Sequence, residues 1–216
     1  MIRKPPLVRS TGFQQTISQT SRGPAPLALV VYGSVIALTL GVAIARGKSP
    51  FEAEAWLPVD GATSHALSFF GGVVLATLTI HTTQKLVRRW RWAKSLHTDL
   101  RPTIRHAGNA TILILGIASG LAEELFFRGL LASAFGVVIS SLAFGALHQL
   151  RGRTGWIWAG MATVMGVLFA SLFLATGSLV GPIVAHTAIN VVNLRFLRDT
   201  DVEPKKTRRL GGLLDT

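Results

Sequence analysis

The chain contains no cysteine among its 216 residues. This absence excludes disulfide bonds, cysteine-ligated metal centres and a thiol nucleophile, so a metal ion would need histidine and carboxylate ligands. Acidic charge is also scarce, with ten Asp and Glu residues against 22 Lys and Arg residues. Charged residues of both signs make up only 15% of the chain. Each acid inside an apolar segment therefore needs a physical explanation.

Hydrophobic residues are abundant, at 49% of the chain, and the mean hydropathy is +0.46. They gather in long runs, such as APLALVVYGSVIALTLGVAIA at residues 25 to 45. A helix of this length crosses a hydrocarbon core of about 30 Å. The composition and the runs together indicate an integral, multi-pass membrane protein surrounded by lipid.

The apolar runs predict an all-α, polytopic transmembrane helix bundle of about six spans, at residues 25 to 45, 64 to 84, 108 to 131, 134 to 150, 156 to 175 and 179 to 196. All Lys and Arg residues except Arg46, Lys48 and Arg128 lie in alternate connections, in the two tails or, for Arg195, at the end of the last span. By the positive-inside rule, both termini are therefore expected in the cytoplasm. No base-reading motif accompanies the net charge of +12, so nucleic acid is not an expected partner.

Two features outside the spans also bear on the topology. Ala43 and Ala45 form an A-x-A pattern, and cleavage there by a signal peptidase would leave five spans and an external N-terminus. The full spanning length of the run favours a retained helix instead. The basic segment VRRWRWAK, residues 87 to 94, is expected along the anionic inner leaflet, with Trp90 and Trp92 at headgroup level. Both tails are expected to be disordered.

The stretch GLAEELFFRGLL, residues 120 to 131, places two acids and one base in an apolar span. An ionised carboxylate near a helix centre costs about 2.5–3.5 kcal/mol on insertion scales. Glu124 and Arg128 are four residues apart and can form an ion pair on one helical face. Glu123 lies about 100° round the helix and needs another partner. Ionisable residues within a membrane are functional by default, which favours a functional site over a purely structural pair.

Three motifs in three successive apolar helices resemble those of the CPBP family of intramembrane proteases. They are E-E-x-x-x-R (Glu123, Glu124, Arg128), F-x-x-x-H (Phe144, His148) and H-x-x-x-N (His186, Asn190). The family includes type II CAAX prenyl endopeptidases and bacterial relatives linked to bacteriocin processing and immunity. The resemblance implies a four-helix catalytic core at residues 108 to 196. A basic tail (1 to 24), two helices with a basic loop (25 to 107) and a second tail (197 to 216) surround this core.

The resemblance implies hydrolysis of a peptide bond in a membrane-associated peptide or protein, in a bacterial cytoplasmic membrane. Such hydrolysis needs an activated water, stabilisation of the oxyanion and a proton for the leaving amine. The expected general base is Glu123, with Glu124 held by Arg128 and with His148 positioning the water. The expected oxyanion donors are His186 and Asn190, and Phe144 is expected to pack. A carboxylate with both histidines could bind Zn²⁺, whereas the absence of H-E-x-x-H leaves a metal-free glutamate and histidine mechanism equally open.

Other readings of the same residues remain. Ser119 with His186 is a weak candidate for a serine protease, because GIASG at 116 to 120 departs from G-x-S-G. Buried Glu and His chains also serve transporters and proton relays, although no internal repeat is present. A catalytically silent scaffold or immunity factor is the third reading. On straight helices His148 would lie nearer the cytoplasm than Glu123 and His186, so either the helices tilt or the fourth span starts deeper, near Phe135.

Overall fold

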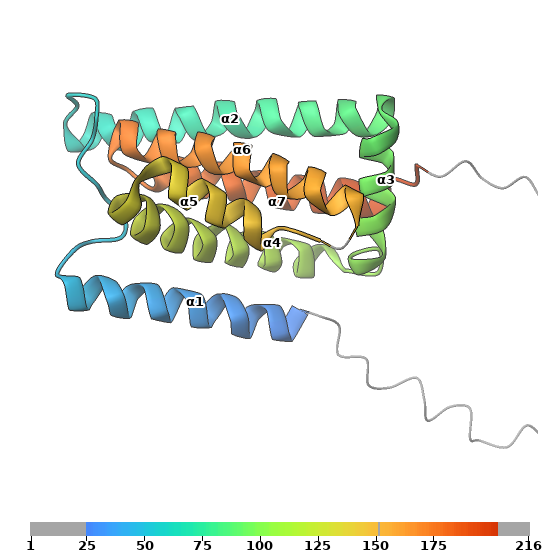
Figure 1. Ribbon diagram of the computed structural model, residues 1–216, viewed down its shortest axis with the longest axis horizontal. Coiled ribbons are helices and arrows are strands. Elements are labelled where there is room, and N and C mark those ends of the chain that lie inside the picture. The colour runs from blue at the N-terminus through green and yellow to red at the C-terminus, as the bar shows by residue number, and fades with distance from the viewer. Residues whose placement is uncertain (1–24, 151, 203–216) are drawn as a thin grey trace, which may run out of the picture.

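The computed structural model describes residues 25–150 and 152–202, so residues 1–24 and 203–216 of the two tails expected to be disordered lie outside these residues. Residues 197–199 of the second predicted tail are helical, so the prediction of disorder is wrong for them. The described chain is helical, without a β-sheet. Figure 1 shows the helices packed in one bundle, with α3 across one end. The elements are α1 (Ala25–Arg46), α2 (Gly61–Arg89), α3 (Arg91–Leu100), η1 (Arg101–Thr103), α4 (Asn109–Glu124), the π-helix η2 (Leu125–Ala132), α5 (Ser133–Leu147), α6 (Arg153–Thr176) and α7 (Val180–Asp199).

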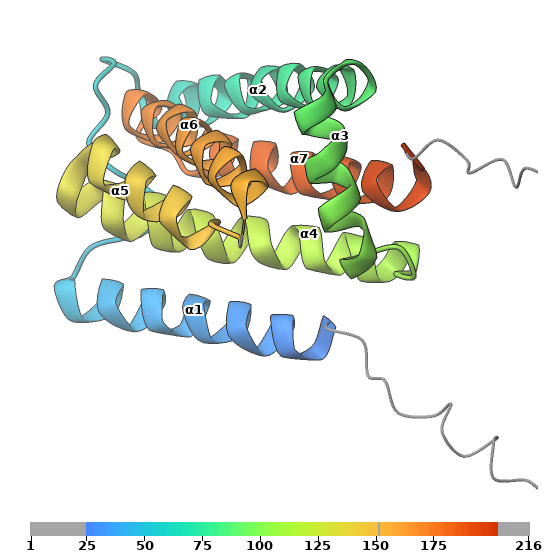
Figure 2. The same cartoon turned by 45° about the vertical axis from the view of Figure 1, so that its right-hand side comes forward.

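Five helical segments of the described chain are long and apolar enough to cross a membrane: Pro26–Arg46, Gly61–Arg89, Asn109–Leu147, Arg153–Thr176 and Val180–Asp199. The third segment reverses at Gly136, whose φ of 79° and ψ of 178° are not helical. Glycine tolerates this positive φ because it lacks a Cβ. The helix α5 therefore runs antiparallel to α4 (Figures 1 and 2). The first residue of α1 and the last residue of α7 lie at the same end of the bundle. The prediction of a polytopic helix bundle is confirmed.

The arm α5 is shorter than the predicted span at 134 to 150. Its regular part, from Gly136 to Leu147, is about 16 Å long at 1.5 Å per residue, or about half of a hydrocarbon core. Figure 1 shows α5 ending part-way along α4 and α6. The prediction of a full fourth span is wrong, because the reversal at Gly136 and the end of the helix at Leu147 confine this arm to one half of the bundle. His148 consequently lies within the bundle and not at its cytoplasmic end.

Close helix contacts depend on small residues. On α4, Gly116 and Gly120 face α7, and an added Cβ would lie 2.4 Å from a side-chain carbon of Val191 and 2.5 Å from the hydroxyl of Thr187, respectively. Small residues four apart let membrane helices approach closely, which lipid-facing Leu or Val would prevent. The consequence is that α4 and α7, which carry Glu124 and His186, pack directly against each other.

The two ends of the bundle are covered differently. At one end, the loop between α1 and α2 docks on the turn between α6 and α7, where Ala53 N–H donates to Gly177 O at 3.0 Å. At the other end, α3 is strongly amphipathic and buries Ala93, Leu96 and His97. The predicted basic segment 87 to 94 is thus divided at Trp90, which is 55% exposed and separates α2 from α3.

Candidate active site

A buried ion pair lies at the junction of α4 and the π-helix. Arg128 Nη1 donates to Glu124 Oε1 at 2.9 Å, and both residues are 0% exposed. The spacing of four residues predicted this pair. Single-turn π segments occur frequently at functional sites, and here the π-helix begins immediately after Glu124.

The Arg128 guanidinium is enclosed by aromatic faces. Its Cζ lies 4.4 Å from the ring centroid of Phe144 and 5.0 Å from that of Phe169. Arg128 Nη2 also approaches Gly166 O at 3.4 Å. Cation–π attraction and one carboxylate thus replace water around this charge. The predicted packing role of Phe144 agrees with this placement.

The carboxylate of Glu124 also orients His186 of α7. Its Oε1 accepts a hydrogen bond of 2.6 Å from His186 Nδ1. The His186 ring stacks on Phe169, with centroids 5.3 Å apart and an interplanar angle of 20°. A carboxylate that already accepts from arginine can only accept from the imidazole, so His186 carries its proton on Nδ1. The lone pair of His186 Nε2 is then directed elsewhere.

Glu123 lies beside Glu124 but faces a different group of side chains. Its Oε2 is 3.7 Å from His148 Nε2 and 3.8 Å from His186 Nε2. Among the described residues, this buried Oε2 has no hydrogen-bond partner. Glu123, His148 and His186, which are distant in the sequence, therefore converge at one point. The depth mismatch between His148 and the other two is resolved by the short α5.

His148 is oriented from within its own helix. Its Nδ1 lies 2.8 Å from the carbonyl oxygen of Phe144 and must donate, because a carbonyl only accepts. In the neutral imidazole its Nε2 is then a lone pair that faces Glu123, as for His186. The ring also contacts Phe144 and Trp158, with centroids 4.4 and 6.0 Å away. Three acceptor atoms that face one point need a water, an added proton or a cation between them.

The donor set of two imidazole nitrogens and one carboxylate oxygen fits a divalent cation chemically, since Zn²⁺ favours these ligands. Both imidazoles also have an oriented second nitrogen, as metal-bound histidines usually do. The separations of 3.7 and 3.8 Å exceed the spacing of about 3.3 Å between tetrahedral zinc ligands. Accordingly, no group of three His, Asp or Glu side chains in the described part of the chain is preformed to hold an ion.

Asn190 lies one turn after His186, where the motif places it, and its side-chain amide is engaged with α4. Asn190 Nδ2 donates to Ser119 Oγ at 2.9 Å, and the Ser119 hydroxyl approaches Gly116 O at 3.3 Å. Ser119, the residue of the weaker serine hypothesis, is buried. Its observed contacts orient Asn190.

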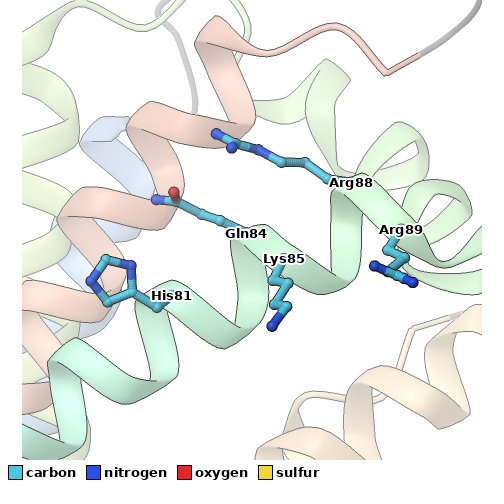
Figure 3. Close-up of a pocket in the computed structure, with 5 residues that line it drawn as sticks. All are labelled: His81, Gln84, Lys85, Arg88 and Arg89. Atoms are coloured by element: carbon cyan, nitrogen blue, oxygen red, sulfur yellow. The ribbon is translucent and has the colours of Figure 1, made fainter.

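The converging side chains open into a cavity of about 570 Å³ whose lining is mostly apolar. Glu123, His148, His186 and Asn190 line it together with residues of α1, α2, α3 and α6. A shallower hollow of about 550 Å³ lies at the end of α2 (Figure 3). Its lining side chains come from this single helix, and Lys85 projects away from Gln84. That hollow lies on a cationic face of α2.

Comparison with known proteins points to the same family as the three sequence motifs. Residues 106–192 match the family model described as type II CAAX prenyl endopeptidase Rce1-like. The segment that contains most of the predicted four-helix core is therefore similar to an Rce1-like domain. The match confirms the CPBP resemblance, and the apolar helices indicate an integral, multi-pass membrane protein.

Similarity to individual proteins covers a smaller part of the chain. Over 81 residues the chain is 36% identical to the uncharacterized protein YpbD of Bacillus subtilis (strain 168). The aligned stretch covers 38% of this chain and 42% of that protein, so the chain spans less than half the length of this relative. No solved structure matches the chain.

The structure adds residues to the site that the sequence does not reveal. Phe169 stacks on His186 and lies over Arg128, but its sequence context in α6 is simply apolar. Tyr32 of α1 lines the cavity as well. The only sequence signal for Tyr32 is that it is the single tyrosine of the chain.

Proposed function

We propose that this protein is an intramembrane endopeptidase that hydrolyses a peptide bond in a membrane-associated peptide or protein. The observation that carries the proposal is the convergence of the Glu123 carboxylate with the Nε2 atoms of His148 and His186 at 3.7 and 3.8 Å. These groups line a mostly apolar cavity inside a bundle of membrane-spanning helices. The match to an endopeptidase family supports the same reaction.

In this proposal, Glu123 is the general base. A water between its free Oε2 and the two histidines loses a proton to Glu123 as its oxygen attacks the peptide carbonyl. His148 accepts the second hydrogen of that water at its Nε2 atom, and the Nε2 atom of His186 faces the same point. The proton held by Glu123 then passes to the leaving amine, which completes the hydrolysis. Because the cavity is mostly apolar, the charges that develop during the reaction interact strongly with these groups.

The remaining motif residues position this group. Arg128 holds Glu124, and Glu124 holds the Nδ1 proton of His186, so that His186 Nε2 faces Glu123. Asn190, anchored by Ser119, presents its amide to the same cavity and stabilises the oxyanion. Glu123, His148 and His186 would also be the ligands of a divalent cation. Such a cation supplies Lewis-acid polarisation and lowers the pKa of its bound water.

The test is turnover of a library of membrane-anchored peptides by the full-length protein in nanodiscs. We expect wild-type cleavage, and a decrease of about 10²–10⁴-fold in kcat for Glu123→Gln, with large losses for His148→Ala and His186→Ala. Glu54→Gln is the matched control, because Glu54 is an exposed acid in the loop between α1 and α2. Metal analysis of the same samples separates the two mechanisms. Stoichiometric zinc in the wild-type protein that is absent from the histidine variants supports metal catalysis.

Two results would contradict the proposal. Full activity of Glu123→Gln would remove Glu123 as the base. Wild-type protein that is folded and cleaves no peptide, yet carries protons or solutes across proteoliposomes, would favour the transporter reading. Folded protein inactive in both assays would favour the silent scaffold.

A further inference from the structure

Several polar side chains of the central cavity belong to none of the three motifs. Among them are Tyr32 on α1 and Asn193 on α7. Both lie outside residues 106–192, the segment that matches the family model. They are therefore features of this chain that the family match does not explain.

Tyr32 reaches the site from α1, a helix that packs on α4 and the π-helix. Its side chain lines the cavity together with Ser119, whose hydroxyl accepts the amide N–H of Asn190. Glu123 lines the same cavity. A phenol both donates and accepts hydrogen bonds, so the Tyr32 hydroxyl can pair with a polar group of a bound ligand. Tyr32 thus shares one cavity with the catalytic group.

Asn193 lies three residues after Asn190 and so shares a face of α7 with it. Its side-chain Oδ1 is buried and has no hydrogen-bond partner among the described residues. An unpaired buried acceptor destabilises a folded protein, and such groups call for a specific explanation. Its position in the lining of the cavity suggests that a bound ligand supplies the missing donor.

We propose that Tyr32 and Asn193 bind the backbone of the substrate peptide beside Glu123. An extended peptide presents both C=O and N–H groups along its length. The phenol of Tyr32 donates to a substrate carbonyl, and Asn193 Oδ1 accepts from a substrate N–H. The apolar lining receives the substrate's side chains. This inference rests on the proposed endopeptidase function and extends the substrate site to α1, outside the Rce1-like domain.

The first test compares kcat and KM of Tyr32→Phe and Asn193→Leu with wild type, using the membrane-anchored peptide library and full-length protein in nanodiscs. Each substitution removes one hydrogen bond to the bound substrate, so KM should rise about three- to tenfold while kcat stays within about twofold. Ser34→Ala is the control, because it removes an exposed hydroxyl from the same helix α1 and should leave both constants unchanged.

Thermal unfolding separates binding from structure. Asn193→Leu removes an unpaired buried oxygen, so the variant should unfold at or above the wild-type temperature despite its higher KM. A lower unfolding temperature with an unchanged KM would identify Asn193 as a structural residue. Unchanged KM in Tyr32→Phe would likewise overturn the role of Tyr32.

A binding measurement tests the inference independently of activity. Because Tyr32 is the only tyrosine, ring-labelled tyrosine gives a single NMR signal. Adding the peptide library to the Glu123→Gln variant should shift this signal, and Asn193→Leu should weaken the response. A shift without wild-type cleavage would refute the endopeptidase function and retain Tyr32 as a binding residue. Wild-type cleavage with an unmoved Tyr32 signal would refute the inference alone.

Discussion

At the residue scale, the buried pair of Glu124 and Arg128 is predicted to serve function as well as stability. Arg128→Ala leaves an uncompensated buried carboxylate and should lower the free energy of unfolding by about 3–5 kcal/mol. The double variant Glu124→Leu with Arg128→Met removes both charges of the pair and should recover much of this stability. It should remain inactive, because His186 loses the carboxylate that orients it. Denaturation and peptide cleavage in the same nanodiscs measure both effects.

The control is Arg46→Ala, which removes an exposed arginine at the end of α1 and should alter neither stability nor cleavage. A double variant with wild-type activity would show that Glu124 does not orient His186. The pair itself was predictable, since i, i+4 spacing and the expense of buried charge require it. The hydrogen bond from His186 to Glu124 was not predictable, because contacts between distant helices leave no trace in local spacing.

At the element scale, the close approach of α4 and α7 is predicted to align Glu124 with His186. Gly120→Ala would place a Cβ 2.5 Å from Thr187 Oγ1 and 3.0 Å from Thr187 N. The backbone nitrogen cannot rotate away, so the helices must separate, at a cost of about 1–3 kcal/mol. We expect lower stability and a loss of kcat. Gly41→Ala on α1 has nothing within 4 Å of the added Cβ and serves as the matched control. Full activity of Gly120→Ala would contradict the alignment role.

The sequence predicted the elements more reliably than their extent. Apolar runs located every long helix, because length and hydropathy alone satisfy the lipid environment. They did not predict that α5 crosses only part of the bundle, since residues 133 to 147 are as apolar as those of a full span. The reversal depends on one glycine with a positive φ. This local conformation places His148 at the level of Glu123, which hydropathy could not reveal.

At the scale of the whole molecule, the arrangement predicts that the two ends of the bundle face opposite sides of the membrane. The loop between α1 and α2 and the helix α3 lie at opposite ends (Figure 1). By the positive-inside rule, the end that carries the basic residues around α3 faces the cytoplasm.

Because the chain has no cysteine, single-cysteine variants report one site each. In intact spheroplasts, a membrane-impermeant maleimide should label Glu54→Cys, whereas Ser95→Cys on α3 should react only after the membrane is opened. Both positions are exposed in the fold, so burial would not account for protection. Labelling of both variants in intact spheroplasts would contradict this arrangement, and the reverse pattern would place α3 outside the cell.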